Sequence, residues 1–266
     1  MTRTLALLLA ASALGPGCAT TGVPTGQRTQ LTGCDHYSGW CNEVRTAAVE
    51  AFAYAQIAAN AYRNGPYDVG PDFKWIDGAD NDGRGFAYTV YEYRPGGRLH
   101  SVVLGFRGTE TTFSDWIVGN LLGLQNARGL AVFDRLRATY GPDIDIVVAG
   151  HSLGGGIATH VSLRRARAPA FVFNTSPRFS ARGPVPDNPR LSIVEYGEWL
   201  KAARIFGREP TQRYISIGCT RGADPIRQHG IRLLADCLTR IAAYEDGDAR
   251  ASLARNRIAA PEPAPR

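Results

Sequence analysis

A ten-residue stretch in the middle of the chain constrains the fold more than any other feature. Residues 147–156 read Val-Val-Ala-Gly-His-Ser-Leu-Gly-Gly-Gly, so β-forming apolar residues run into Gly-His-Ser-Leu-Gly and small residues follow. A strand, a sharp turn and a helix are what a G-x-S-x-G nucleophile elbow requires. Such a turn strains the serine backbone and leaves no room for side chains on its neighbours, so glycine is required at positions 150 and 154. We therefore predict that Ser152 is a nucleophile at a strand end. The alternative is a plain glycine-rich turn.

The segments around this stretch alternate between strand and helix patterns. Apolar and β-branched runs predict strands over 86–94, 101–106, 144–149, 170–174, 191–196 and 213–218. Helical periodicity predicts helices over 46–63, 114–124, 128–140, 153–167 and 228–244, and residues 77–85 are expected to form a loop. This alternation indicates an α/β fold with one mainly parallel sheet and helices on both faces. A chain of 266 residues is long enough for one such domain.

The N-terminus has the pattern of an export signal. A short basic start is followed by an apolar run over residues 5–14 and by Gly-Pro-Gly-Cys, which predicts a signal peptide over residues 1–17. A cysteine directly after small residues resembles a bacterial lipoprotein signal, in which Cys18 is the lipidated first residue. Gly15 stands where such signals usually have an aliphatic residue, so ordinary secretion is the alternative. Residues 19–33 are expected to form a flexible tether, and residues 246–266, rich in proline and alanine, a disordered tail.

The cysteine content agrees with export. Apart from Cys18 there are four cysteines, which allow three pairings, and proximity favours Cys34–Cys41 and Cys219–Cys237. We expect no metal site and no cofactor, because no C-x-x-C pair exists and the Asp-rich segment at residues 80–83 lacks essential calcium ligands. The formal charge of +6 comes from scattered arginines without a basic block, so we expect no nucleic-acid partner.

Two further stretches carry a resemblance to a known family. Residues 103–109 read Val-Leu-Gly-Phe-Arg-Gly-Thr and are followed by Asp115-Trp116 and Asn120. This pattern, placed shortly before the Gly-His-Ser-Leu-Gly stretch, resembles the first motif of the class 3 (fungal-type) lipases. Residues 173–178 are similar to that family's segment after the next strand, except that Thr175 stands where the family usually has glycine. The resemblance covers roughly residues 46–240 and implies an α/β-hydrolase fold and ester hydrolysis. We place the whole domain at residues 34–245.

A serine hydrolase also needs donors for the oxyanion and a base for the hydroxyl proton. The residue after the elbow serine supplies one backbone N–H, so Leu153 is assigned by geometry, and Thr109 is the second donor by its match to the family motif. Of the five histidines, His229 follows the last predicted strand and comes last in the chain order of serine, acid and histidine expected for this fold. A Cys219–Cys237 disulfide would hold the loop that carries it.

The acid has two candidates. Glu198 follows the predicted strand 191–196, at the position where the class 3 lipases have an aspartate, and hydrolases of this fold use either carboxylate. Asp224 lies five residues before His229 in Ala-Asp-Pro. Its alternative role is structural, because an aspartate before proline often starts a turn. We expect Ser152, Glu198 and His229 to form a triad, with Asp224 as the alternative acid.

The expected substrate is an acyl ester of a lipid, a glycerolipid or a phospholipid. An export signal, a possible anchor at Cys18 and a basic net charge favour lipid esters at a membrane surface of the bacterial envelope, the outer membrane or periplasm, and no specific protein partner is inferred. The apolar segment from Trp116 to Leu124 would form either a lid or a core-facing helix. The alternatives are an esterase for small soluble esters, a serine peptidase, and a non-enzymatic envelope lipoprotein that kept the fold.

Overall fold

The computed structural model describes residues 32–62, 64–80, 85–108, 119–176, 185–198, 200, 213–220 and 224–261. Seven strands form a single sheet in which the spatial order follows the chain order. The strands are β1 (Phe73–Ala79), β2 (Tyr88–Tyr93), β3 (Ser101–Phe106), β4 (Asp145–His151), β5 (Ala170–Phe173), β6 (Arg190–Glu195) and β7 (Arg213–Ile217). The pairs β1–β2 and β2–β3 are antiparallel, and every pair from β3 to β7 is parallel.

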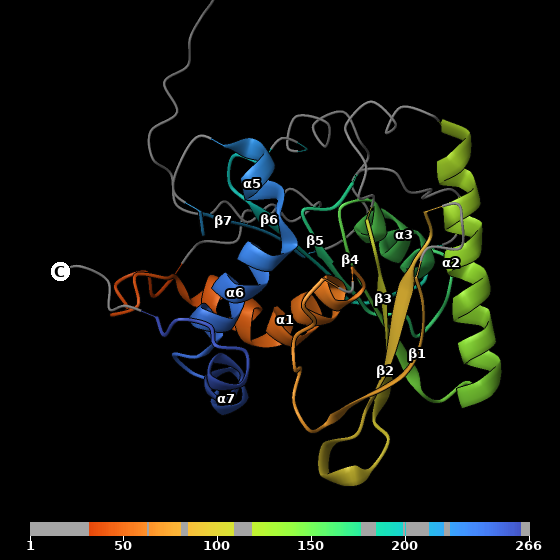
Figure 1. Ribbon diagram of the computed structural model, residues 1–266, viewed down its shortest axis with the longest axis horizontal. Coiled ribbons are helices and arrows are strands. Elements are labelled where there is room, and N and C mark those ends of the chain that lie inside the picture. Colours follow the sequence, from red (N-terminus) through yellow and green to blue (C-terminus); the bar gives the residue numbers. More distant parts are fainter. Residues whose placement is uncertain are drawn as a thin grey trace, which may run out of the picture.

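Helices cover both faces of the sheet, as the alternating pattern predicts (Figure 1). One face carries α1 (Asn42–Asn60), α6 (Ile231–Ala242) and α7 (Gly247–Arg255), and the other carries α2 (Gly119–Tyr140) and α3 (Leu153–Ser162). Because side chains alternate across a strand, Val103 of β3 packs in the α1–α6 layer, while Val102 and Leu104 pack in the α2–α3 layer. The chain therefore has two apolar cores, one on each side of the sheet, in the mainly parallel arrangement of an α/β-hydrolase fold.

The C-terminal segment differs from the sequence-based prediction. Instead of a disordered tail over 246–266, residues Gly247–Arg255 form α7, which begins at Asp246, whose carboxylate accepts the N–H of Ala249. The buried Gln56 of α1 donates to the hydroxyl oxygens of Thr239 in α6 and Ser252 in α7 at 2.9 and 2.8 Å. This polar contact between three helices is not visible in local composition, which is why the polar segment was expected to be a tail.

Three other predicted boundaries need correction. Residues 73–79, partly expected as a loop, form the antiparallel edge strand β1. The segments 114–124 and 128–140, expected as two helices, are joined from Gly119 to Tyr140 in the single helix α2. The final helix predicted over 228–244 is divided at Gly230 into the short helix α5 (Pro225–His229) and α6. Gly230 has an extended backbone, with φ −64° and ψ 124°, so the helical path is interrupted there.

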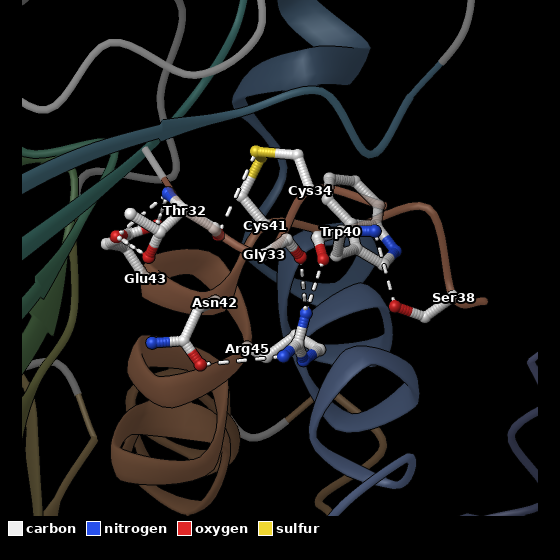
Figure 2. Close-up of a disulfide and its surroundings, with 9 residues drawn as sticks. All are labelled: Thr32, Gly33, Cys34, Ser38, Trp40, Cys41, Asn42, Glu43 and Arg45. Atoms are coloured by element: carbon white, nitrogen blue, oxygen red, sulfur yellow. Dashed lines mark hydrogen bonds between the residues drawn. A yellow bond between two sulfur atoms is a disulfide. The ribbon is translucent and has the colours of Figure 1, made fainter. Parts of the chain in front are cut away.

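The start of the domain is fastened to the first turn of α1 (Figure 2). Cys34 and Cys41 form a disulfide, and Arg45 donates to the carbonyls of Gly33 and Trp40 at 3.1 and 2.6 Å. The backbone N–H and hydroxyl of Thr32 donate to the carboxylate of Glu43. Residues 32 and 33 thus belong to the folded domain rather than to the expected tether, of which residues 19–31 lie outside the described residues. Among the described helices, none is long and apolar enough to cross a membrane.

Candidate active site

The predicted turn at Ser152 is present between β4 and α3. Ser152 has φ 57° and ψ −123°, a conformation that a residue with a side chain rarely adopts. A Cβ atom on Gly150 would lie 2.3 Å from the carbonyl oxygen of Gly154, and a Cβ on Gly154 would lie 2.3 Å from that of Phe106. Both glycines are therefore required sterically, since α3 begins in contact with β4 and with the end of β3.

Ser152, His229 and Glu198 lie in one hydrogen-bonded chain. Nε2 of His229 is 2.9 Å from Oγ of Ser152, and Nδ1 of His229 is 2.9 Å from Oε2 of Glu198. The carboxylate of Glu198 is fully buried and also accepts the backbone N–H of Leu200 at 2.9 Å, while the imidazole of His229 is 14% exposed. Parallel strands bring their carboxyl ends to one edge of the sheet, which is why residues separated by up to 77 positions meet here.

His229 is the last residue of α5 and therefore precedes the final helix α6, whereas the predicted helix over 228–244 placed it near that helix's start. Its main chain is held from two sides. Its carbonyl accepts Nε2–H of His151 at 2.6 Å and the amide of Asn174 at 3.1 Å. The predicted disulfide between Cys219 and Cys237 is present and closes the segment that includes α5. The imidazole therefore projects from a segment that is hydrogen-bonded to the elbow and covalently tied to α6.

Asp224, the alternative acid, has a different position. It is exposed, and its Oδ1 accepts the backbone N–H groups of Ile226 and Arg227 at 3.0 and 3.2 Å. An aspartate in this position caps the start of a helix, and Pro225 follows as the first residue of α5. Of the two predicted carboxylates, Glu198 is the one that contacts His229 in the structure.

Of the two expected oxyanion donors, Leu153 lies among the described residues and Thr109 does not. Leu153 is buried and begins α3, so its N–H belongs to the first turn, where backbone donors have no partner inside the helix. Thr109, the second expected donor, lies outside the described residues, as do Asp115 and Trp116. Gly108 is described, and a Cβ on it would lie 3.0 Å from Cβ of Ser152. The end of β3 therefore lies directly beside the serine.

A second buried carboxyl lies close to Glu198. Glu195 ends β6, is 1% exposed, and its Oε1 accepts the backbone N–H of Thr220 at 2.7 Å. Within the described ranges, its Oε2 has no hydrogen-bond partner. Burial raises the pKa of Glu195 from 4.5 to about 7, and the charge of Glu198 adds to this shift while hydrogen bonds from Thr220 and Cys219 oppose it. Glu195 therefore ionises only near neutral pH.

This carboxyl predicts a pH-dependent stability. The pKa of Glu195 is higher in the folded chain, so the folded state loses stability as the pH rises from 4.5 to about 7. At about 1.4 kcal/mol for each pKa unit, the total is about 3 kcal/mol. Because glutamine resembles the protonated carboxyl, Glu195→Gln should raise Tm at pH 8 and leave it nearly unchanged at pH 4.5. Thermal unfolding of both proteins at the two pH values measures this, and an equal Tm difference at both would contradict it.

The structure also shows interactions that the sequence did not reveal. The ring centroid of His151 lies 4.7 Å from that of His229, and Nδ1 of His151 hydrogen-bonds the hydroxyl of Tyr62. No local pattern marks Tyr62, which follows α1 by two residues. In the part of the chain that the structure describes, no group of three or more His, Cys, Asp or Glu side chains is arranged to hold a metal ion.

Comparison with known proteins agrees with this architecture. Residues 54–178 match the family model of the Tle-like phospholipase domain, a range that includes Ser152 and ends before Glu198 and His229. No protein with a curated description matches the chain. The mainly parallel sheet and the elbow at Ser152 have the arrangement of an α/β-hydrolase fold, and just under half of the chain is similar to the phospholipase-domain model.

Several solved structures are similar to the chain at low identity. A lipase from Rhizopus microsporus var. chinensis is 15% identical with a TM-score of 0.44, covering 68% of this chain and 83% of that one. A triacylglycerol lipase from Penicillium expansum is 14% identical with a TM-score of 0.49, covering 66% and 81%. Lipase II from Rhizopus niveus is 19% identical with a TM-score of 0.45, covering 61% and 77%.

Proposed function

We propose that the protein is a serine ester hydrolase that acts on acyl esters of lipids through Ser152, His229 and Glu198. The observation that carries the proposal is the position of His229, whose two ring nitrogens each lie 2.9 Å from a partner, Ser152 Oγ on one side and Glu198 Oε2 on the other. A base between a hydroxyl and a buried carboxylate is the arrangement that activates a serine nucleophile.

The geometry supports an acylation step with assigned protons. Glu198 accepts Nδ1–H of His229, which leaves Nε2 as a base toward Ser152. As Oγ attacks the ester carbonyl, its proton moves to Nε2, and the imidazolium is stabilised by the Glu198 carboxylate. The carbonyl oxygen becomes an oxyanion, for which we propose the N–H of Leu153 and Thr109 as donors. Nε2–H then protonates the alcohol oxygen as the ester bond breaks, leaving an acyl group on Ser152.

The second half of the reaction reverses these roles. A water molecule gives a proton to Nε2 of His229 and attacks the acyl carbonyl, and the tetrahedral intermediate collapses when Ser152 Oγ leaves and takes the proton back. The products are a free fatty acid and an alcohol, and no cofactor takes part in the proposed cycle. The strained backbone of Ser152, at φ 57°, keeps Oγ at the end of β4 throughout.

The assignment to lipid esters rests on the class of the protein and on its compartment. The matched family model is described as a phospholipase domain. Two disulfides in one chain are typical of exported proteins, which meet lipid at the cell envelope. The proposed signal peptide at residues 1–17 and the lipidated Cys18 lie outside the described residues. The mass of the mature N-terminal peptide tests them, since an unmodified N-terminus would leave ordinary secretion.

A side-by-side substrate profile tests the function. Purified protein is given a triglyceride, a diglyceride, a phospholipid and p-nitrophenyl acyl esters of increasing chain length, and released fatty acid is measured. We expect kcat/KM to rise with chain length and turnover to increase when the substrate forms micelles or vesicles. Equal turnover of short esters above and below the micellar concentration would indicate a soluble esterase. Hydrolysis of none of these esters would refute the proposal.

A further inference from the structure

The elbow histidine joins two parts of the site that are far apart in the chain. Tyr62 follows α1, Gly108 follows β3, and His229 ends α5. His151 lies between them, buried, with Nδ1 2.7 Å from the hydroxyl of Tyr62 and Nε2 2.6 Å from the carbonyl oxygen of His229. The same hydroxyl accepts the backbone N–H of Gly108 at 3.0 Å. A continuous row of hydrogen bonds thus runs from the end of β3 to the main chain of the candidate base.

The direction of every bond in this row follows from its two ends when the imidazole of His151 is neutral. The carbonyl of His229 can only accept, so Nε2 of His151 carries a proton. In the neutral imidazole Nδ1 is then an acceptor, which makes the Tyr62 hydroxyl its donor. The oxygen of Tyr62 in turn accepts from Gly108, whose N–H can only donate. All donors therefore point one way, from Gly108 through Tyr62 and His151 to His229.

The two ends of the row are the places where catalysis is most sensitive to position. Gly108 directly precedes the candidate oxyanion donor Thr109 in the chain, and a Cβ on it would lie 2.5 Å from the Tyr62 hydroxyl and 2.8 Å from the His151 carbonyl. At the other end, the row reaches the carbonyl of His229, the same residue whose imidazole contacts Ser152. A displacement of about 1 Å at a reacting group can lower a rate about 100-fold.

We propose that Tyr62 and His151 are positioning residues that hold the end of β3 and the main chain of His229 in register for the reaction at Ser152. The proposal rests on the proposed function, because it assigns these residues to that site. Neither side chain is a proton acceptor for Ser152, since His229 takes that place at 2.9 Å. Asn174 supports the same carbonyl with its amide at 3.1 Å, while its Oδ1 accepts the N–H of Glu195 at 2.7 Å, so β5 and β6 share in the support.

Three substitutions test the row by kinetics. Tyr62→Phe removes only the hydroxyl, His151→Phe removes both ring nitrogens with little change of shape, and His151→Gln restores one donor. We expect kcat for a p-nitrophenyl ester to fall about 10- to 100-fold in Tyr62→Phe and His151→Phe, with KM changed less than about 3-fold. His151→Gln should have a higher kcat than His151→Phe. The double variant Tyr62→Phe/His151→Phe should be no slower than the slower single variant. Either substitution alone already interrupts the row of hydrogen bonds, so the second has nothing further to remove.

A matched control separates positioning from stability. Tyr91 is buried where Tyr62 is half-buried, its hydroxyl accepts one hydrogen bond from Asn60 at 3.0 Å, and both rings pack in the core layer of α1. Tyr91→Phe should lower Tm by an amount similar to Tyr62→Phe and leave kcat unchanged. If Tyr91→Phe lowers kcat as much as Tyr62→Phe, or if the two effects in the double variant multiply, Tyr62 and His151 act only through general stability and the proposal fails.

Nuclear magnetic resonance of ¹⁵N-labelled histidine tests the row without any substrate. We expect His151 to carry its proton on Nε2, with Nδ1 unprotonated, and the Nδ1 resonance to move in Tyr62→Phe as its hydrogen bond is lost. An Nδ1-protonated His151, or a resonance unchanged in Tyr62→Phe, would overturn the proposal even in an active enzyme. If the wild-type protein hydrolyses no ester, the proposed function fails in the kinetic assay, and the tautomer still decides whether the row exists.

Discussion

Ser152→Ala is expected to lower kcat for acyl esters by about 10⁴-fold or more. The side chain loses only the oxygen that lies 2.9 Å from Nε2 of His229, so no other group can form the acyl intermediate at this place. Alanine can occupy the φ of 57° about as well as serine does, because both carry a Cβ, and we expect the free energy of unfolding to change little. The loss would therefore be chemical and not structural.

The measurement is kcat for a p-nitrophenyl ester together with covalent labelling by a fluorophosphonate. Ser162→Ala is the matched control, since Ser162 is a fully buried serine near the other end of the same helix, away from His229. Ser162→Ala should keep both turnover and labelling, and Ser152→Ala should lose both. Retention of more than about one tenth of the turnover in Ser152→Ala would remove the basis for a serine mechanism.

The second large effect is expected at Glu198, the proposed acid. Glu198→Gln keeps the size of the side chain and an oxygen for Nδ1–H, but removes the negative charge that stabilises the imidazolium of His229 in the proposed mechanism. Because the carboxylate is fully buried, little water is present to replace that charge. Replacing a triad aspartate by its amide lowers kcat by about 10⁴-fold, and we expect a loss of at least about 100-fold here.

Asp224→Asn is the matched comparison. Its Oδ1 would still accept the N–H groups of Ile226 and Arg227, and asparagine is as good an N-terminal cap as aspartate. Turnover should therefore stay within about 2-fold of the wild type, because the substitution leaves both the cap and Glu198 in place. The pH profile of kcat/KM for both variants makes the comparison. Similar, mild losses in the two would show that neither carboxylate is the acid.

Several features of the site follow from short stretches of sequence. The conformation of Ser152 depends on neighbours within about ten residues, where glycine on both sides and a β-forming run leave few alternatives. The position of His229 follows from chain order, because the loops that follow successive parallel strands all lie at the same edge of the sheet. The predicted disulfides Cys34–Cys41 and Cys219–Cys237 join cysteines that are near neighbours in the chain, so loop closure favoured them.

Other features depend on which strands and helices become neighbours. Glu198 and Asp224 both precede His229 and both have a plausible local role, and only the position of β6 beside β7 brings one of them to Nδ1. The relation of Tyr62 to His151 spans 89 residues and leaves no local pattern. The same is true of α7, whose polar sequence gave no sign that Ser252 would accept a hydrogen bond from the buried Gln56 of α1.

By itself, the sequence determined the elbow at Ser152 and the mainly parallel α/β class, because backbone sterics and strand–helix alternation act over short distances along the chain. It also named His229 as the candidate base from chain order. The tertiary structure decided which carboxylate contacts His229, where the C-terminal helix packs, and how Tyr62 and His151 connect the end of β3 to the main chain of His229. The physical reason is that a hydrogen bond depends on distance and direction in space, to within a few tenths of an ångström. Residues far apart in the chain reach that geometry only when the sheet has set their places.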